Sequence, residues 1–232
     1  MMMKDFRIGI IRVITLKREE EINRHGKMIE EVFPNLRTVS RCIEKQPRGI
    51  FDKKSEDEAV PKIIRVAKQL LNENVDGIIV SCVADPAVNA IQTFSKKPVV
   101  GAGKPTALLA LSVSDKVGAL GIGDEPPKPV SEILKGRLIS YRKPRGVSAT
   151  IDLERNVESA VEAAEQLIRD GAQVIALCCT GFSTIGLAPI LQEKLRIPVI
   201  DPIIAAGTIM YHELIRTFML RSLWEVGWRS KL

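Results

Sequence analysis

Aromatic residues make up only 4% of the 232-residue chain, and no uninterrupted apolar run reaches the ~18 residues that suggest a transmembrane helix. The four cysteines form no C-x-x-C pair, and the two histidines form no H-E-x-x-H motif. The glycine-rich segment GAGKP (101–105) lacks the spacing of a phosphate-binding loop. These absences argue against a membrane protein, a metal site and a nucleotide site. They leave a core built mainly from Ile, Val, Leu and Ala.

The formal net charge is +6, but basic residues are not separated from acidic ones. In KREEEINRHGKMIEE (17–31) the two signs alternate, and we expect His25 in this segment to be exposed. The chain has no recognition-helix or zinc-finger pattern, so we expect no nucleic-acid partner. The apolar N-terminal stretch carries Arg12 and no small-residue cleavage site, which favours a first strand over a signal peptide. We expect a cytoplasmic protein with reduced thiols.

Short apolar runs alternate with longer amphipathic segments along the whole chain, which predicts an α/β fold with parallel sheets. The predicted strands cover 7–14, 36–42, 77–82, 98–101, 116–122, 136–142, 173–179 and 198–202. The predicted helices cover 17–33, 55–74, 86–94, 104–113, 153–170 and 184–195, with further helix to the end. Residues 124–129 (DEPPKP) are predicted as a proline-rich loop.

An internal repeat divides the chain in two. The segment VAKQLLNENVDGIIVSC (66–82) aligns without gaps on AAEQLIRDGAQVIALCC (163–179), and the last identical pair is Cys82 with Cys179. Each unit is a helix, a strand that ends in cysteine, a second helix and a strand that starts with proline. The repeat predicts two pseudo-symmetric Rossmann-like lobes, one formed by 1–103 plus 203–232 and the other by 104–202.

Cys82 and Cys179 are predicted at the carboxyl ends of strands, where open α/β sheets bind their ligands. Each precedes a loop and a helix N-terminus, which is expected to lower the pKa of the thiol. Two thiols that face each other across an interlobe cleft can invert a carbon next to a carbonyl, because one removes the proton and the other delivers it to the opposite face. Backbone N–H groups near the cysteines can hold the carbanion's charge, and no cofactor or metal is required. Cys42 and Cys178 are expected to pack in the core.

The two cysteine segments resemble motifs of the aspartate/glutamate/hydantoin racemase superfamily. IIVSCVADPAV and KPVVG match its first motif, VIALCCTGF and IPVID match its second, and the hydantoin racemase branch is the most similar. The resemblance makes Cys179 the second catalytic residue, with Cys178 in the place of a glycine. It implies a cofactor-independent 1,1-proton transfer in a homodimer or higher homo-oligomer. Where members of this branch usually have an Asn-Pro-Asn segment after the first strand, this chain has Val13, Ile14, Thr15 and Leu16.

On these grounds we expect racemisation or epimerisation of a small carbonyl compound such as a 5-substituted hydantoin. Alternatives are an Asp/Glu racemase or a maleate-type isomerase of the same superfamily, or a non-catalytic two-lobed small-ligand binding protein. Asp85 is expected to cap the helix that it begins, or to orient the cysteine loop. The residues expected to contact substrate beside the thiols are Thr15, Ser81, Val83, Ala84, Asp85, Thr180 and Gly181. The C-terminal segment with Trp224 and Trp228 is expected to dock on the protein itself or to form a subunit interface.

Overall fold

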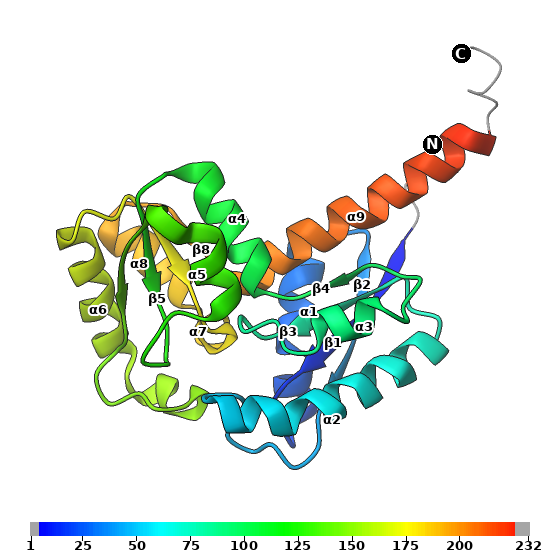
Figure 1. Cartoon of the computed structure of the whole chain (residues 1–232), viewed down its shortest axis with the longest axis horizontal. Coiled ribbons are helices and arrows are strands. Elements are labelled where there is room, and N and C mark those ends of the chain that lie inside the picture. Colours follow the sequence, from blue (N-terminus) through cyan, green and yellow to red (C-terminus); the bar gives the residue numbers. More distant parts are fainter. Residues whose placement is uncertain (1–4, 226–232) are drawn as a thin grey trace.

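A computed structural model describes the backbone of residues 5–225 and the side chains of residues 5–219. It contains two four-stranded parallel sheets with helices around them, which confirms the predicted α/β fold (Figure 1). The first sheet has the strand order β2-β1-β3-β4 and the second the order β6-β5-β7-β8. The side chains of Trp224 and Trp228 lie outside the described part, so the role expected for them stays a prediction.

The first sheet is formed by β1 (Phe6–Arg12), β2 (Leu36–Cys42), β3 (Gly77–Ser81) and β4 (Val99–Val100). The second is formed by β5 (Val117–Leu120), β6 (Leu138–Arg142), β7 (Val174–Leu177) and β8 (Val199–Ile200). The central strands β3 and β7 are buried at every position, whereas the edge strand β2 mixes buried and exposed positions and the edge strand β6 has no buried position. This difference follows from their places in the sheets, since a central strand is covered on both faces.

The helices of the first lobe are α1 (Glu19–Val32), α2 (Lys53–Asn72) and α3 (Val88–Gln92). The second lobe carries α5 (Lys128–Leu134), α6 (Val157–Arg169), α7 (Thr180–Thr184) and α8 (Leu187–Leu195), and short 3₁₀ turns lie at Lys135–Arg137 and Thr150–Arg155. The sequence predicted one helix over 184–195, but the structure has two. Gly186 adopts a left-handed backbone (φ 64°) between α7 and α8, which glycine does without strain. Helix α5 was not predicted, because it begins inside the proline-rich stretch 124–129, which was predicted as a loop.

Helices α4 (Gly103–Val113) and α9 (Pro202–Glu225) connect the lobes. Helix α4 follows the first sheet but packs against β7, β8 and α5 of the second, and α9 follows the second sheet but packs against α1, β3 and β4 of the first. The two helices also contact each other, and α9 runs along the first lobe in Figure 1. The expected lobe boundaries, at 103/104 and 202/203, fall at the starts of these two helices.

Three hydrophobic clusters follow from this arrangement. One lies under α2 in the first lobe, and one lies under α6 and α8 in the second. The third contains residues of both sheets together with α4 and α9, so it is shared by the lobes.

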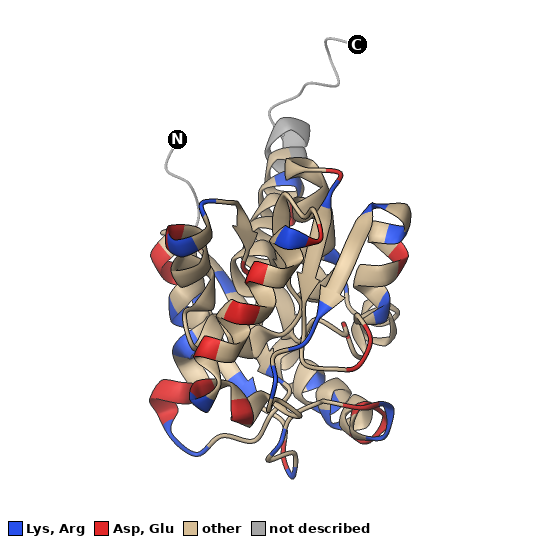
Figure 2. Cartoon of the chain, turned by 90° about the vertical axis from the view of Figure 1, so that its left-hand side faces the viewer, with Lys and Arg blue, Asp and Glu red and all other residues tan. Residues whose placement is uncertain are grey.

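On the surface, basic and acidic positions are interleaved along the helices of the side shown in Figure 2. No helix within residues 5–225 is both long and apolar enough to span a membrane.

Candidate active site

A cavity of about 190 Å³ lies where the carboxyl ends of the central strands of both sheets meet. In the first sheet, β1 ends at this cavity with Arg12 and β3 ends there with Ser81. In the second sheet, the turns that follow β5 and β7 line the same cavity. Both Cys82 and Cys179 line it. The residues predicted from the repeat are therefore brought into one site, although they are far apart in the sequence.

Cys179 occupies the N-cap position of α7, and its Sγ accepts a hydrogen bond from the Gly181 N–H at 3.4 Å. The Thr150 hydroxyl lies 3.8 Å from the same sulfur. Cys179 is 8% exposed, and burial raises the pKa of its thiol while these donors and the Phe182 N–H oppose the rise. The expected lowering of the thiol pKa by the helix N-terminus was wrong, because burial outweighs the hydrogen bonds.

Burial also raises the pKa of the Cys82 thiol, and there the Ala84 N–H is the hydrogen-bond donor that opposes it. The proximity of Cys179 raises the pKa of Cys82 further, since two thiolates would repel each other. The two sulfurs thus favour a state with at most one thiolate. Cys179 has more donors than Cys82, so its sulfur is the better place for that negative charge.

Cys178 differs from its neighbour. It is 3% exposed, packs in the cluster that both lobes share, and donates from its Sγ to the Ala176 carbonyl at 3.5 Å. Cys179 packs in the outer cluster of the second lobe instead. The two side chains point to opposite faces, as expected for neighbours in an extended segment, although Cys178 also forms part of the cavity wall.

Most of the residues expected to contact substrate line the cavity with the thiols: Ser81, Val83, Ala84, Thr180 and Gly181. The other two do not belong to its lining. Thr15 is occupied elsewhere, because its hydroxyl donates to the Ile43 carbonyl at 2.8 Å and accepts from the Gln46 N–H at 2.8 Å. It fixes the loop after β2, so a contact between Thr15 and substrate has no support in this structure.

Asp85 caps a helix, but not the one that it was expected to begin. Its carboxylate accepts from the N–H groups of Gly103 (2.6 Å) and Lys104 (2.9 Å) at the start of α4. Gly101 and Gly103 allow this close approach, because a Cβ at either position would collide with Asp85 or with the Val83 carbonyl. Asp85 therefore ties the Cys82 loop to the start of α4. Burial raises the pKa of its carboxyl to about 6.

The second lobe has an equivalent capping aspartate, Asp201, in a segment of different sequence. The Asp201 carboxylate accepts from the N–H groups of Ile203 (2.8 Å) and Ile204 (3.1 Å) at the start of α9. It also accepts from the Ser183 hydroxyl at 2.9 Å, and Ser183 belongs to the helix that Cys179 caps. In both lobes a partly buried aspartate ties the cysteine segment to the N-terminus of a helix that crosses to the other lobe.

Three residues of the site were missed or misplaced by the sequence analysis. His25 is 1% exposed and lines the cavity, so its expected exposure was wrong. The signal was available, since Ile22, His25 and Ile29 share one face of α1 at helical spacing. Arg12 is 5% exposed and its Nη1 donates to the carbonyls of two α1 residues, Glu21 and Ile22. Thr150 reaches Cys179 from a distant loop, for which the sequence gives no signal.

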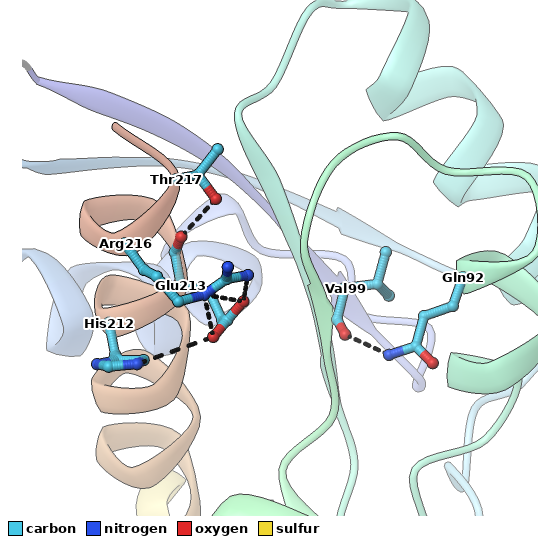
Figure 3. Close-up of polar contacts among 6 residues, drawn as sticks. All are labelled: Gln92, Val99, His212, Glu213, Arg216 and Thr217. Atoms are coloured by element: carbon cyan, nitrogen blue, oxygen red, sulfur yellow. Dashed lines mark hydrogen bonds and ion pairs between the residues drawn. The ribbon is translucent and has the colours of Figure 1, made fainter. Parts of the chain in front are cut away.

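The other histidine lies away from this cavity. His212 is on α9, where its Nε2 lies 3.9 Å from Glu213 Oε1, and the same carboxylate accepts hydrogen bonds from Arg216 (Figure 3). Across the view, Gln92 donates to the Val99 carbonyl at 2.9 Å and ties α3 to the edge strand β4. Within the residues described, no group of three or more His, Cys, Asp or Glu side chains is arranged to hold a metal ion.

Comparison with known proteins places the chain in a family. The family model for Asp/Glu/hydantoin racemase matches residues 31–208. The hydantoin racemase of Paenarthrobacter aurescens is 30% identical over 167 residues, which cover 68% of this chain and 69% of that protein. The hydantoin racemase of Pseudomonas sp. (strain NS671) is 26% identical over 170 residues, covering 68% and 66%. The matched segments thus span about two thirds of these relatives.

Solved structures share the fold. The allantoin racemase of Pseudomonas fluorescens superposes with a TM-score of 0.77 at 23% identity, over 91% of both chains. The allantoin racemase of Klebsiella pneumoniae gives a TM-score of 0.75 at 21% identity, over 96% of this chain and 89% of that one. The family model covers most of the chain, including Cys82 and Cys179. The chain is an isomerase of the racemase class and belongs to the Asp/Glu/hydantoin racemase family.

Proposed function

We propose that this protein is a cofactor-independent racemase of small 5-substituted hydantoins and that Cys82 and Cys179 are its two proton-transfer groups. The observation that carries the proposal is the position of both thiols in one cavity between the lobes. The similarity to hydantoin racemases supports the substrate class. The cavity of about 190 Å³ is smaller than the ~300–1,000 Å³ of typical drug-sized ligand sites, which favours a small substituent at C5.

The reaction begins with one thiolate and one thiol. The thiolate takes the proton from C5 of the hydantoin, and the electron pair of the broken C–H bond passes onto the adjacent carbonyl oxygen as an enolate. The other thiol then gives its proton to the opposite face of C5. The product is the mirror-image hydantoin, and thiol and thiolate have exchanged places.

Backbone N–H groups of the two cysteine loops are proposed to hold the enolate oxygen. Val83, Ala84, Thr180 and Gly181 line the cavity beside the sulfurs, so the main chain of both loops can reach a substrate there. Charge that develops on oxygen is stabilised strongly by such donors in a site that excludes water. Cys179 is the thiolate in the free enzyme in this proposal, because its sulfur has more hydrogen-bond donors than that of Cys82.

The test is incubation of each pure enantiomer of a hydantoin panel in deuterated water with the wild type, Cys82→Ser and Cys179→Ser. The wild type is expected to racemise the substrate and to place deuterium at C5. Each variant lacks one of the two proton-transfer groups, so racemisation should fall by about 10²–10⁴-fold. The remaining thiol still serves one face, so the two variants should exchange opposite enantiomers.

Cys178→Ala is the matched control, since it removes a neighbouring thiol that the proposal gives no role. Racemisation by either serine variant at the wild-type rate would refute the two-thiol mechanism. Exchange of aspartate or glutamate but not of hydantoins would identify an amino-acid racemase. Binding of these compounds without any exchange in the wild type would point to a binding protein instead.

A further inference from the structure

His25 connects the two cysteine segments across the lobes. It lies on α1 of the first lobe, and its Nδ1 is 2.7 Å from the hydroxyl of Ser81, the residue before Cys82. Its Nε2 is 2.8 Å from the hydroxyl of Thr184, at the end of the helix that Cys179 caps. One imidazole ring thus bonds to both segments that carry the thiols, which are 97 residues apart in the sequence.

The other hydrogen bonds at this point assign a direction to the contacts of His25. Thr184 donates its hydroxyl proton to the Thr180 carbonyl (3.4 Å), so its oxygen is free to accept from Nε2–H of His25. Nδ1 then accepts from the Ser81 hydroxyl. Thr180 donates its own hydroxyl to the Ser81 carbonyl at 3.2 Å. Four residues form a closed ring of hydrogen bonds between the lobes.

This arrangement corresponds to a neutral imidazole, because a charged ring would also donate from Nδ1 and the Ser81 hydroxyl would have to turn its proton to another acceptor. Burial, Arg12 and Arg24 lower the pKa of His25 well below its ordinary value, in that order of importance. His25 therefore stays neutral at physiological pH. No hydrogen bond of His25 reaches a sulfur atom, and the chain of donors ends on a carbonyl, so the ring does not supply a proton to the reaction.

We propose that His25 is a positioning residue that holds the Cys82 loop and the Cys179 helix at the separation needed for proton transfer on both faces of one carbon. The inference rests on the proposed function. Its physical basis is the steep dependence of such reactions on geometry, since a misplacement of about 1 Å can cost about 10²-fold in rate. Cys82 directly follows Ser81 and Cys179 directly precedes Thr180, and both of these neighbours belong to the ring. Loss of the ring is therefore expected to change the distance between the two sulfurs.

The variant that tests this is His25→Phe, which keeps a ring of similar size but removes both hydrogen bonds. Thr184→Val removes the bond between His25 and α7 together with the bond from Thr184 to the Thr180 carbonyl, but it leaves the bond between His25 and Ser81 in place. His212→Phe is the matched control, because it makes the same substitution at the other histidine, which is exposed on α9. Two readouts are taken on each protein: steady-state racemisation of the hydantoin panel, and amide hydrogen exchange of the segments 81–86 and 179–185.

We expect hydrogen exchange to accelerate at least about tenfold in both segments of His25→Phe, with no change in distant peptides. We expect kcat to fall about 10–100-fold while KM stays within about threefold, because binding survives and alignment does not. In Thr184→Val the exchange of 179–185 should accelerate, and combining it with His25→Phe should add little, since both act through one ring. His212→Phe should match the wild type.

The positioning role is overturned if both segments keep their wild-type exchange in His25→Phe, or in Thr184→Val should the first variant not fold. It is also overturned if the segments loosen but kcat is unchanged. Failure of the proposed function gives a different result. A wild type that racemises no member of the panel refutes that function, whereas the exchange measurement still shows whether His25 couples the two segments.

Discussion

At the scale of single residues, adjacent cysteines have different surroundings and are expected to differ in function. Cys178 is packed in the cluster that both lobes share, and Cys179 accepts a hydrogen bond from the helix that it caps. Cys178→Ala should retain racemisation within about threefold and lose about 1 kcal/mol of unfolding free energy, as is common for a small deletion in a core. Cys179→Ala should abolish racemisation with a similar loss of stability, because Cys179 is also buried and caps α7. Activity assays and urea denaturation of both variants measure this. Loss of activity in a folded Cys178→Ala would reverse the assignment.

A second residue-scale prediction concerns Thr150, whose hydroxyl lies 3.8 Å from the sulfur of Cys179 and can donate to its thiolate, which lowers the pKa of that thiol. Thr150→Val keeps the shape and removes the donor, so the pKa of Cys179 should rise further above its ordinary value. The thiolate forms at higher pH as the pKa rises, and the pH–rate profile should therefore move to higher pH. Loss of about 1 kcal/mol corresponds to about fivefold lower activity at neutral pH.

Thr150→Ser retains the hydroxyl and serves as the control for Thr150→Val. It should keep the wild-type profile, and the rate of Cys179 alkylation, followed by mass spectrometry over pH 6–10, should shift in the valine variant only. An unchanged alkylation profile in Thr150→Val would mean that the main-chain donors alone support the thiolate.

At the scale of elements, the start of α4 accepts the carboxyl group of Asp85 as its cap, and burial disfavours the ionised form of this group. Burial raises the pKa of Asp85 to about 6, against about 3.9 in an unfolded chain. The folded state therefore binds this proton more tightly, and its contribution to stability is full below about pH 4 and is lost as the pH rises through about 6. Relative to Asp85→Asn, the wild type should be more stable at pH 4.5 than at pH 7.5 by about 2 kcal/mol, since most of this shift is expressed between the two pH values.

Asp52→Asn is a control of opposite sign for that experiment. Asp52 caps α2 through the Ser55 N–H at 2.7 Å, and hydrogen bonds from Ser55 lower the pKa of its exposed carboxyl. Its contribution is present above the unfolded pKa and is lost as the pH falls through the folded one. Urea denaturation at several pH values measures both differences. A pH-independent difference in unfolding free energy between wild type and Asp85→Asn would show that burial does not raise the pKa of Asp85.

The elements also show what the sequence can and cannot reveal. Strands β3 and β7 were predicted closely, because a fully apolar run ending in a polar turn is characteristic of a central parallel strand. Their cysteines were consequently placed at the correct edge of the sheets. The partner of Asp85 could not be predicted, since a capping residue normally binds its own helix and this one binds a helix 18 residues further on. The contact of Thr150 likewise depends on how the loop after β6 packs.

At the scale of the whole molecule, each lobe is covered by a helix that follows the sheet of the other lobe in sequence: α4 packs on the second sheet and α9 on the first. This packing is expected to make the two lobes one cooperative unit. The shared cluster contains Ile79 of the first sheet, Ala176 of the second, Ala107 of α4 and Met210 of α9, all without solvent exposure. Neither lobe can unfold alone without exposing this surface. We therefore expect one unfolding transition in urea, with far-UV circular dichroism and the hydrogen exchange of peptides from β3 and β7 sharing a midpoint.

Met210→Ala tests that cooperativity directly. Met210 is fully buried on α9 next to Gly77 of the first sheet, and truncating such a side chain costs about 2–5 kcal/mol. Because α9 belongs to the cluster of both lobes, the midpoint for β7 in the second lobe should fall as much as the midpoint for β3. Ile190→Ala, at a half-exposed position of α8, should move neither by more than a small amount. A variant in which β3 loses protection while β7 keeps it would show that the lobes fold independently. The geometry between Cys82 and Cys179 would then depend on the hydrogen-bonded ring at His25 rather than on a common core.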